Sequence, residues 1–143
     1  MVVHINNNIA KAVCDYINDQ IDAGAGPGLL RVYSGTRPAS ADTALAGTET
    51  LLIEFELADP AFAASTTVGN TGTAVANAVT PVQALATGTA SFFQILDSDE
   101  TVIFDGSVTD INGVGDLKLS TTAVVSGIDV TVVSLTAVMP EGV

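Results

Sequence analysis

Four acidic residues gather around one expected turn and raise the question of a calcium site. Asp97, Asp99 and Glu100 lie close together, with Asp105 nearby. A helix–loop–helix calcium loop needs oxygen ligands at fixed positions, a glycine at position six and a glutamate at position twelve. Counted from the first aspartate, both of those positions hold valine. The pattern therefore favours a solvated hairpin tip, and a weak cation site there is the alternative.

A second pair of carboxylates has the spacing of an acid–base pair. Glu54 and Glu56 alternate along one expected strand and so share a face, roughly 7 Å apart. Two carboxylates at such a distance serve as acid and base in glycoside hydrolysis. The chain has no tryptophan and a single histidine to accompany them. We therefore expect an exposed strand face and no active site.

The remaining chemical side chains are isolated in the sequence. His4 is the only histidine and Cys14 the only cysteine, so neither has a companion ligand for a metal ion. Cys14 falls in an expected helix, where we interpret it as a small packing residue. The glycines at Gly69 and Gly72 lack the lysine and following helix of a phosphate-binding loop. The sequence predicts no catalytic, cofactor or metal site, and no enzyme.

Charge restricts the partners. Sixteen acidic residues against four basic ones give a formal net charge of −12. Nucleic acids and anionic membranes attract clustered Lys and Arg, so binding to either is not expected. Neither a signal peptide nor an apolar run long enough to span a membrane is visible, and a lone cysteine fits a reducing compartment. We expect synthesis in the cytoplasm and partners that are neutral or locally basic.

One helix is expected near the N-terminus. Three asparagines, Asn6–Asn8, supply an N-cap, and Gly24 ends the helix. Helical spacing predicts that one face holds the apolar residues Ile9, Val13, Tyr16, Ile17 and Ile21. The opposite face would hold the polar residues Asp15, Asn18, Asp19 and Asp22. Amphipathicity allows the apolar face to pack on the protein's own sheet or on a neighbouring subunit.

The rest of the chain has the pattern of β structure. The predicted strands are Leu29–Tyr33, Leu51–Leu57, Thr89–Leu96, Thr101–Val108, Leu117–Leu119 and Ile128–Met139. The stretch Ala64–Ala86 is the least specified, and we interpret it as short strands or a mobile arm. These strands predict an all-β fold, an antiparallel jelly-roll-like β-sandwich with one N-terminal amphipathic helix. Residues 1–143 form a single domain, with the helix in 1–28 and the sandwich in 29–140.

Two features of the predicted strands bear on packing. The hairpin arms Thr89–Leu96 and Thr101–Val108 are apolar on both faces, so the hairpin should be covered on both sides. We expect a neighbouring subunit or the helix on its second face, and the interface residues to be Phe92, Phe93, Ile103 and Phe104. In the last strand the inward phase changes by one residue, which predicts a β-bulge near Val132 and Val133.

Several segments resemble a known group of proteins. They are Leu30–Pro38 (LRVYSGTRP), Ala58–Phe62 (ADPAF), Gly88–Val108 and Leu119–Pro140. Together they span most of the chain and resemble small virion proteins of tailed bacteriophages, above all capsid decoration (cement) proteins. The shared motifs are turns and core positions, so the resemblance supplies no binding residues.

The resemblance implies a role without chemistry. It implies a homo-oligomer that binds the major capsid protein on the outer shell of a virion and stabilises that shell, with no cofactor or small-molecule substrate. A tail or baseplate component is one alternative. A carbohydrate-binding or adhesin module on the same kind of sandwich is another, although it usually needs aromatic platforms.

Overall fold

The computed structural model describes residues 3–139, so Pro140, the last residue of the predicted β region, lies outside the described residues. It contains one helix and twelve strands, mostly short. In chain order these are α1 (Asn7–Ile21), β1 (Leu29–Ser34), β2 (Thr50–Glu56), β3 (Thr66–Val68), β4 (Thr71–Val75), β5 (Val82–Gln83), β6 (Gly88–Thr89), β7 (Phe92–Leu96), β8 (Val102–Asp110), β9 (Leu117–Leu119), β10 (Ala123–Val124), β11 (Asp129–Val130) and β12 (Val132–Met139).

Eight strands form one large sheet, in the order β2-β1-β7-β8-β9-β12-β4-β3. All neighbours are antiparallel except β8 and β9, so the sheet is mixed. Two small two-stranded sheets pair β10 with β6 and β11 with β5. The prediction of a β-rich chain with one helix is confirmed.

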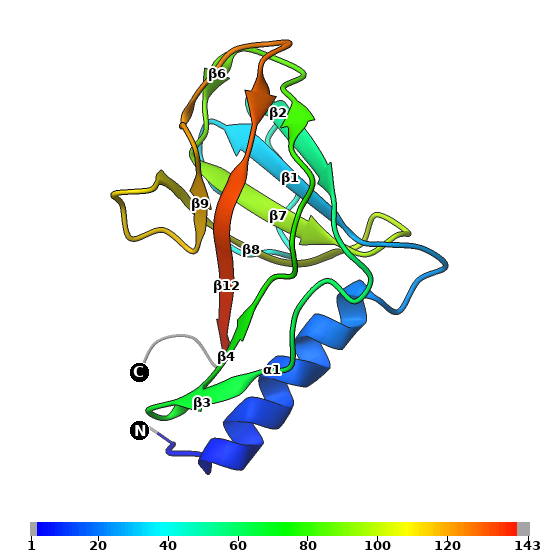
Figure 1. Ribbon diagram of the computed structural model, residues 1–143, viewed down its shortest axis with the longest axis vertical. Coiled ribbons are helices and arrows are strands. Elements are labelled where there is room, and N and C mark those ends of the chain that lie inside the picture. Colours follow the sequence, from blue (N-terminus) through cyan, green and yellow to red (C-terminus); the bar gives the residue numbers. More distant parts are fainter. Residues whose placement is uncertain (1–2, 140–143) are drawn as a thin grey trace.

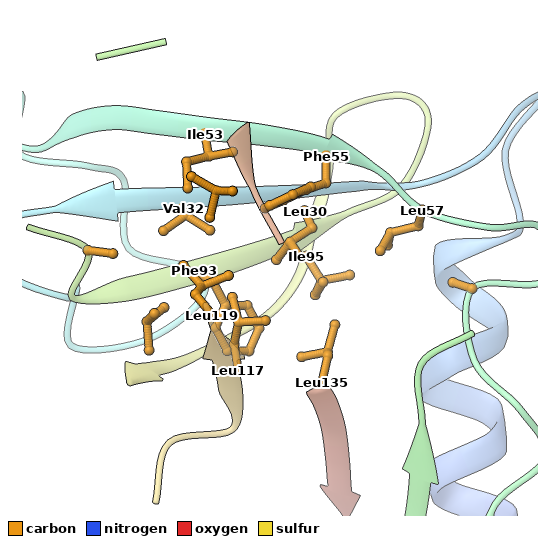
Figure 2. Close-up of a cluster of buried hydrophobic side chains, with 14 of the residues drawn as sticks. Leu30, Val32, Ile53, Phe55, Leu57, Phe93, Ile95, Leu117, Leu119 and Leu135 are labelled. Atoms are coloured by element: carbon orange, nitrogen blue, oxygen red, sulfur yellow. The ribbon is translucent and has the colours of Figure 1, made fainter. Parts of the chain in front are cut away.

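The large sheet bends so that β12 crosses in front of β1 and β7 (Figure 1). The core lies between these layers. Leu30, Val32, Ile53 and Phe55 point inward from β1 and β2, toward Leu117, Leu119 and Leu135 of β9 and β12 (Figure 2). Each of these side chains is fully or almost fully buried. On β2 the buried Ile53 and Phe55 lie on the face opposite Glu54 and Glu56, as the alternation of that strand predicted.

The predicted hairpin forms from β7 and β8, with Phe93 opposite Gly106. Every residue of β7 is buried, as expected for a strand covered on both faces. That burial is complete within one chain: Phe92 and Phe93 are each 1% exposed, and the Phe92 ring stacks on Tyr33. Assigning Phe92 and Phe93 to an interface was wrong, because a buried ring has no free surface for a partner. Ile103 and Phe104 are half-buried, and for them the interface stays a prediction.

Bulges break the ladder at three places. Val133 is the extra residue of β12 against β9, because Val132 pairs with Leu119 and Ser134 with Lys118. This confirms the predicted bulge, although Val133 itself faces solvent. The pairing of β1 with β2 skips Leu52, and that of β7 with β8 skips Ile103. Extra residues of this kind sharpen the local bend of a sheet.

The poorly specified stretch Ala64–Ala86 contains a hairpin, β3–β4, that packs along α1 (Figure 1). The contact is close. A Cβ atom at Gly72 would lie 2.5 Å from the carbonyl oxygen of Ala10 and 2.7 Å from Cβ of Cys14. Glycine is therefore required at residue 72 for the helix to approach the strand.

The helix begins where the sequence predicted. Asn6 is the N-cap, and its side-chain oxygen accepts a 2.8 Å hydrogen bond from the backbone N–H of Asn8. The helix ends at Ile21, with Asp22 as its C-cap. It packs on the protein's own sheet, chiefly against β4, β12 and β3. Of the two alternatives that amphipathicity allowed, the helix therefore packs on its own chain.

The orientation of the helix differs from the prediction. Its buried residues are Ala10, Cys14, Asn18 and Ile21. The carboxylates of Asp15 and Asp22 also face the protein, where they accept hydrogen bonds from residues 65 and 61. In contrast, Ile9 is 54% and Tyr16 67% exposed. We call these two residues, together with the half-buried Val13 and Ile17, the helix stripe.

Candidate functional site

A cleft opens where the large sheet splits. Short β9 pairs with β8 only from Val108 onward and with β12 only as far as Leu135. Beyond these points no strand separates the first part of β8 from the last part of β12 in the described residues. The resulting cleft has a volume of about 360 Å³ and is lined by both strands and by residues of the loop after β1.

Asp105 is the buried charge of this cleft. Its side chain is 5% exposed. Arg37, from the loop after β1, donates to its Oδ1 from Nε at 2.9 Å and from Nη2 at 2.6 Å. Nη2 also donates to the backbone carbonyl of Asp105 at 3.3 Å. The other carboxylate oxygen, Oδ2, is buried without a hydrogen-bond partner among the described residues.

Asp116 closes one end of the cleft and joins its two sides. Its Oδ2 accepts from the backbone N–H of Ser107 at 3.2 Å and from the Ser107 hydroxyl at 3.1 Å. Its backbone carbonyl accepts from the N–H of Thr136 at 3.1 Å. One residue thereby satisfies backbone or side-chain donors on both β8 and β12, which holds the two strands at a fixed separation.

The chemistry of the cleft suits binding. Phe93, Phe104 and Met139 provide apolar walls, and Asp105 provides a buried acceptor. Two hydroxyl side chains line the cleft, those of Ser40 and Thr136, and the Ser40 hydroxyl pairs with the Thr43 hydroxyl at 3.0 Å. A serine nucleophile needs an adjacent base. The cleft therefore offers recognition of a donor group beside an apolar surface.

Two acidic residues of the β7–β8 turn accept hydrogen bonds, Asp97 from within the turn and Glu100 from β1. Oδ1 of Asp97 accepts from the backbone N–H groups of Asp99 at 3.0 Å and Thr101 at 2.8 Å. The Glu100 carboxylate accepts from Arg31 at 2.9 Å. These bonds define a capped turn, as the sequence predicted. Within residues 3–139, no three His, Cys, Asp or Glu side chains gather in a position to hold a metal ion.

The two glutamates of β2 have different surroundings. Glu54 pairs with Arg31 at 2.6 Å, on the face where Arg31 lies opposite Gln94. Glu56 is exposed and lines a second hollow with Leu57 and Val82. No second carboxylate lines that hollow beside Glu56.

The isolated residues occupy structural or open positions. His4 is exposed and precedes α1. Cys14 is buried, and its thiol lies 3.9 Å from the carbonyl oxygen of Ala137 and 3.6 Å from Nδ2 of Asn18. Burial raises the pKa of the Cys14 thiol, which disfavours the reactive thiolate. Gly69 adopts a positive φ of 58° in the β3–β4 turn.

The sequence did not predict the cleft. Its two charged partners, Arg37 and Asp105, are 68 positions apart, and one of them lies in a loop. The available signal was Asp105 itself, a charge inside an otherwise apolar hairpin arm. A buried carboxylate needs a partner, but the sequence does not say which of four basic residues supplies it.

The helix of the described chain is not long and apolar enough to cross a membrane. No protein-family model, no curated protein sequence and no solved structure matches this chain.

Proposed function

We propose that the protein is a non-enzymatic structural component of a tailed-bacteriophage virion, a capsid decoration protein that self-associates and binds the outer surface of the shell. The finer fold, a β-sandwich of jelly-roll type made by the bent sheet, belongs to the same proposal. The proposal rests on the resemblance in sequence and on the surfaces that the fold leaves uncovered.

The observation that carries the proposal is the exposed helix stripe. A single helix packed on a sheet normally turns its largest apolar side chains inward. Here Ile9 and Tyr16 face solvent, while Ile21 is the one large apolar side chain that the helix buries beside Ala10, Cys14 and Asn18. An apolar row of this kind is typical of a protein–protein contact surface. We propose that a second copy of the chain covers the helix stripe.

The stripe is presented on a firmly held helix. Asp15 accepts two hydrogen bonds from Ser65, and both carboxylate oxygens of Asp22 accept from the N–H of Ala61 at 3.0 and 3.2 Å. The close contact at Gly72 adds packing. A preorganised surface loses less conformational entropy on association, which favours a stable oligomer.

A second set of exposed apolar residues lies close in sequence to the short strands β5, β6, β10 and β11, of which Figure 1 labels β6 at the end of the molecule away from α1. Leu85, Val125 and Ile128 are 60%, 52% and 60% exposed, and we call them the apical cluster. The N–H of Ala84 donates to the carbonyl of Ile128 at 3.0 Å, and the N–H of Gly127 donates to the carbonyl of Ala84 at 2.8 Å. These bonds hold the two apical segments together. We propose that the apical cluster contacts the major capsid protein.

The charges support a protein partner. Three of the four basic side chains are engaged in ion pairs: Lys11 with Asp15, Arg31 with Glu54 and Glu100, and Arg37 with Asp105. Residues 3–139 therefore present no cluster of free cations for a phosphate backbone or an anionic membrane. A negatively charged protein of this kind fits a neutral or locally basic protein surface.

The mechanism is thermodynamic linkage. A protein that binds the assembled shell and not its separate subunits stabilises the shell by mass action. The test is co-sedimentation with purified, undecorated shells of tailed phages. We expect saturable binding at a ratio compatible with icosahedral symmetry. Replacement of Leu85 and Ile128 with serine should abolish binding, and serine at the exposed loop residues Ile111 and Val114 should not.

The other two candidate functions have distinct outcomes. A tail or baseplate component would leave shells undecorated and would appear on tails by particle imaging. A carbohydrate-binding module would bind on a glycan array. Of the two tyrosines and five phenylalanines of the chain, Tyr16 alone is among the exposed large apolar residues, so an aromatic platform for a sugar is lacking in the described residues.

A further inference from the structure

The starting point is the unpaired oxygen of Asp105. Buried polar atoms in folded proteins nearly always have a hydrogen-bond partner, and an exception calls for a ligand or another explanation. Oδ2 of Asp105 has none, although the side chain is 5% exposed and Arg37 occupies its other oxygen. The residue lines the cleft between β8 and β12. A donor group placed in the cleft would satisfy this oxygen.

The edge of β12 supplies a second set of unpaired groups. Thr136 donates its N–H to Asp116, away from β4, whereas the carbonyl of Leu135 accepts from Ala76 on the β4 side. Because backbone groups alternate along a strand, the N–H and C=O of Val138 also point away from β4 and into the cleft. No strand lies beside Val138 on that side among residues 3–139. An extended segment could pair with this edge.

At the free edge of β8, in contrast, side chains form hydrogen bonds with the backbone. Arg37 donates to the carbonyl of Asp105, and the Asp116 carboxylate accepts from the N–H of Ser107. Side chains here take the place of a neighbouring strand, which protects an edge from unwanted pairing. The edge of β12 beside Val138 has no such cover in the described residues, so it is the available one.

We propose that the cleft receives a basic side chain from an extended segment of a partner protein, which pairs through its backbone with β12 beside Val138. The ammonium or guanidinium group donates to Oδ2 of Asp105, and its aliphatic stem lies along Phe104 and Met139. The two carboxylates of Asp105 and Asp116 outnumber the single cation of Arg37 in the cleft. This binding mode is strand addition, with one pocket that selects the side chain.

A partner segment fits better than a free amine. A free amine would satisfy Asp105 alone and would leave the N–H and C=O of Val138 unpaired. A peptide satisfies both the carboxylate and the strand edge. The proposal does not depend on the shell-binding role, because it concerns a different surface from the helix stripe and the apical cluster.

The test is a titration followed by the backbone amide signals of the isotope-labelled protein. The probe is a capped pentapeptide with lysine at its centre and two alanines on each side. The matched peptide has norleucine in place of lysine, which keeps the stem and removes the charge. We expect saturable shifts at Ser107, Asp116 and Val138, with affinity about tenfold higher for the lysine peptide. Equal affinities, or shifts confined to other surfaces, overturn the proposal.

Variants separate the two parts of the recognition. Asp105→Asn should remove the preference for lysine, and Val138→Pro should weaken both peptides because proline lacks the edge N–H and leaves the β4 ladder intact. Asp129→Asn, at an exposed residue of β11, is the control and should bind like the parent.

Butylamine is the third probe. If it binds as tightly as the lysine peptide, strand addition is wrong. The comparison of the two peptides on the parent protein needs no variant, so it holds even where Asp105→Asn misfolds.

Discussion

The carboxylate of Asp15 accepts two hydrogen bonds from Ser65, one from its backbone N–H at 2.8 Å and one from its hydroxyl at 2.6 Å. The same carboxylate pairs with Lys11 at 2.8 Å, one helical turn earlier. The bonds from Ser65 attach the polar side of α1 to the residue that precedes β3. They explain why the helix turns its apolar stripe outward, and the proposed self-association follows from that orientation.

Acid should weaken the attachment of the helix. Hydrogen bonds from Lys11 and Ser65 lower the pKa of Asp15 to about 2, from an ordinary value of 3.8. A carboxyl whose folded-state pKa is depressed contributes stability above its unfolded pKa and loses it as the pH falls through the folded value. We expect this contribution to disappear between about pH 4 and pH 2. Urea midpoints of the parent and of Asp15→Asn, measured across that range, should converge as the pH falls. A constant difference between them would contradict the assignment.

Asp22 should behave with the opposite sign. Burial raises its pKa, although the hydrogen bond from Ala61 acts against this. A raised folded-state pKa means that the folded protein binds the proton more tightly, so the contribution of Asp22 to stability falls as the pH rises through that pKa. Asp22→Asn keeps an oxygen for the Ala61 N–H and removes the half-buried charge. Thermal melts at pH 7 should show a stability equal to or above that of the parent, and a large loss would overturn this interpretation.

The contact at Gly72 should not tolerate a side chain. In Gly72→Ala the new methyl group would overlap Ala10 and Cys14, so the helix or strand must shift. We expect a loss of about 1–3 kcal/mol in the free energy of unfolding. Gly26→Ala is the matched control, since its Cβ would meet nothing closer than Ser98 at 4.0 Å. Urea unfolding of both variants makes the comparison, and equal stabilities would show that the close approach is absent.

The hairpin phenylalanines should behave as core residues. Phe93 is 1% exposed and packs edge-on against Phe104 at a centroid distance of 6.4 Å. Phe93→Ala should cost roughly 3–5 kcal/mol of unfolding free energy, as for other large-to-small core changes. Ile9→Ser, on the helix stripe, should change the stability of the isolated chain by about 0.5 kcal/mol or less. Denaturation at low protein concentration compares them, and similar losses would mean that the stripe is buried.

Local patterns predicted local structure well. Two apolar arms on either side of a polar connection predicted the hairpin, and the phase change in the last strand predicted the bulge at Val133. The asparagines at residues 6–8 predicted the start of the helix, and Gly24 predicted its end only approximately, because the helix ends at Ile21. These signals lie within a few residues of the structure that they specify, so the sequence contains all the information needed to read them.

Long-range contacts were not predictable in the same way. The helix orientation depends on Ser65 and Gly72, which offer hydrogen bonds and space to polar and small side chains. Hydrophobic periodicity depends on apolar residues alone, so it does not detect a surface that binds polar and small side chains. The cleft depends on the pairing of Arg37 with Asp105 and on the shortness of β9, and neither is visible before the strands are placed.

The most direct test of the account is the mass of the purified protein in solution, measured by light scattering. The chain has a mass of 14.4 kDa, so a small symmetric oligomer has a low multiple of that value. We predict such an oligomer for the parent and a folded monomer for the double variant Ile9→Ser, Tyr16→Ser. The control with serine at Ile111 and Val114 should keep the parent's mass. A parent that is monomeric at high concentration, or a stripe variant that keeps the oligomer, would contradict the proposal that the helix stripe is a contact surface.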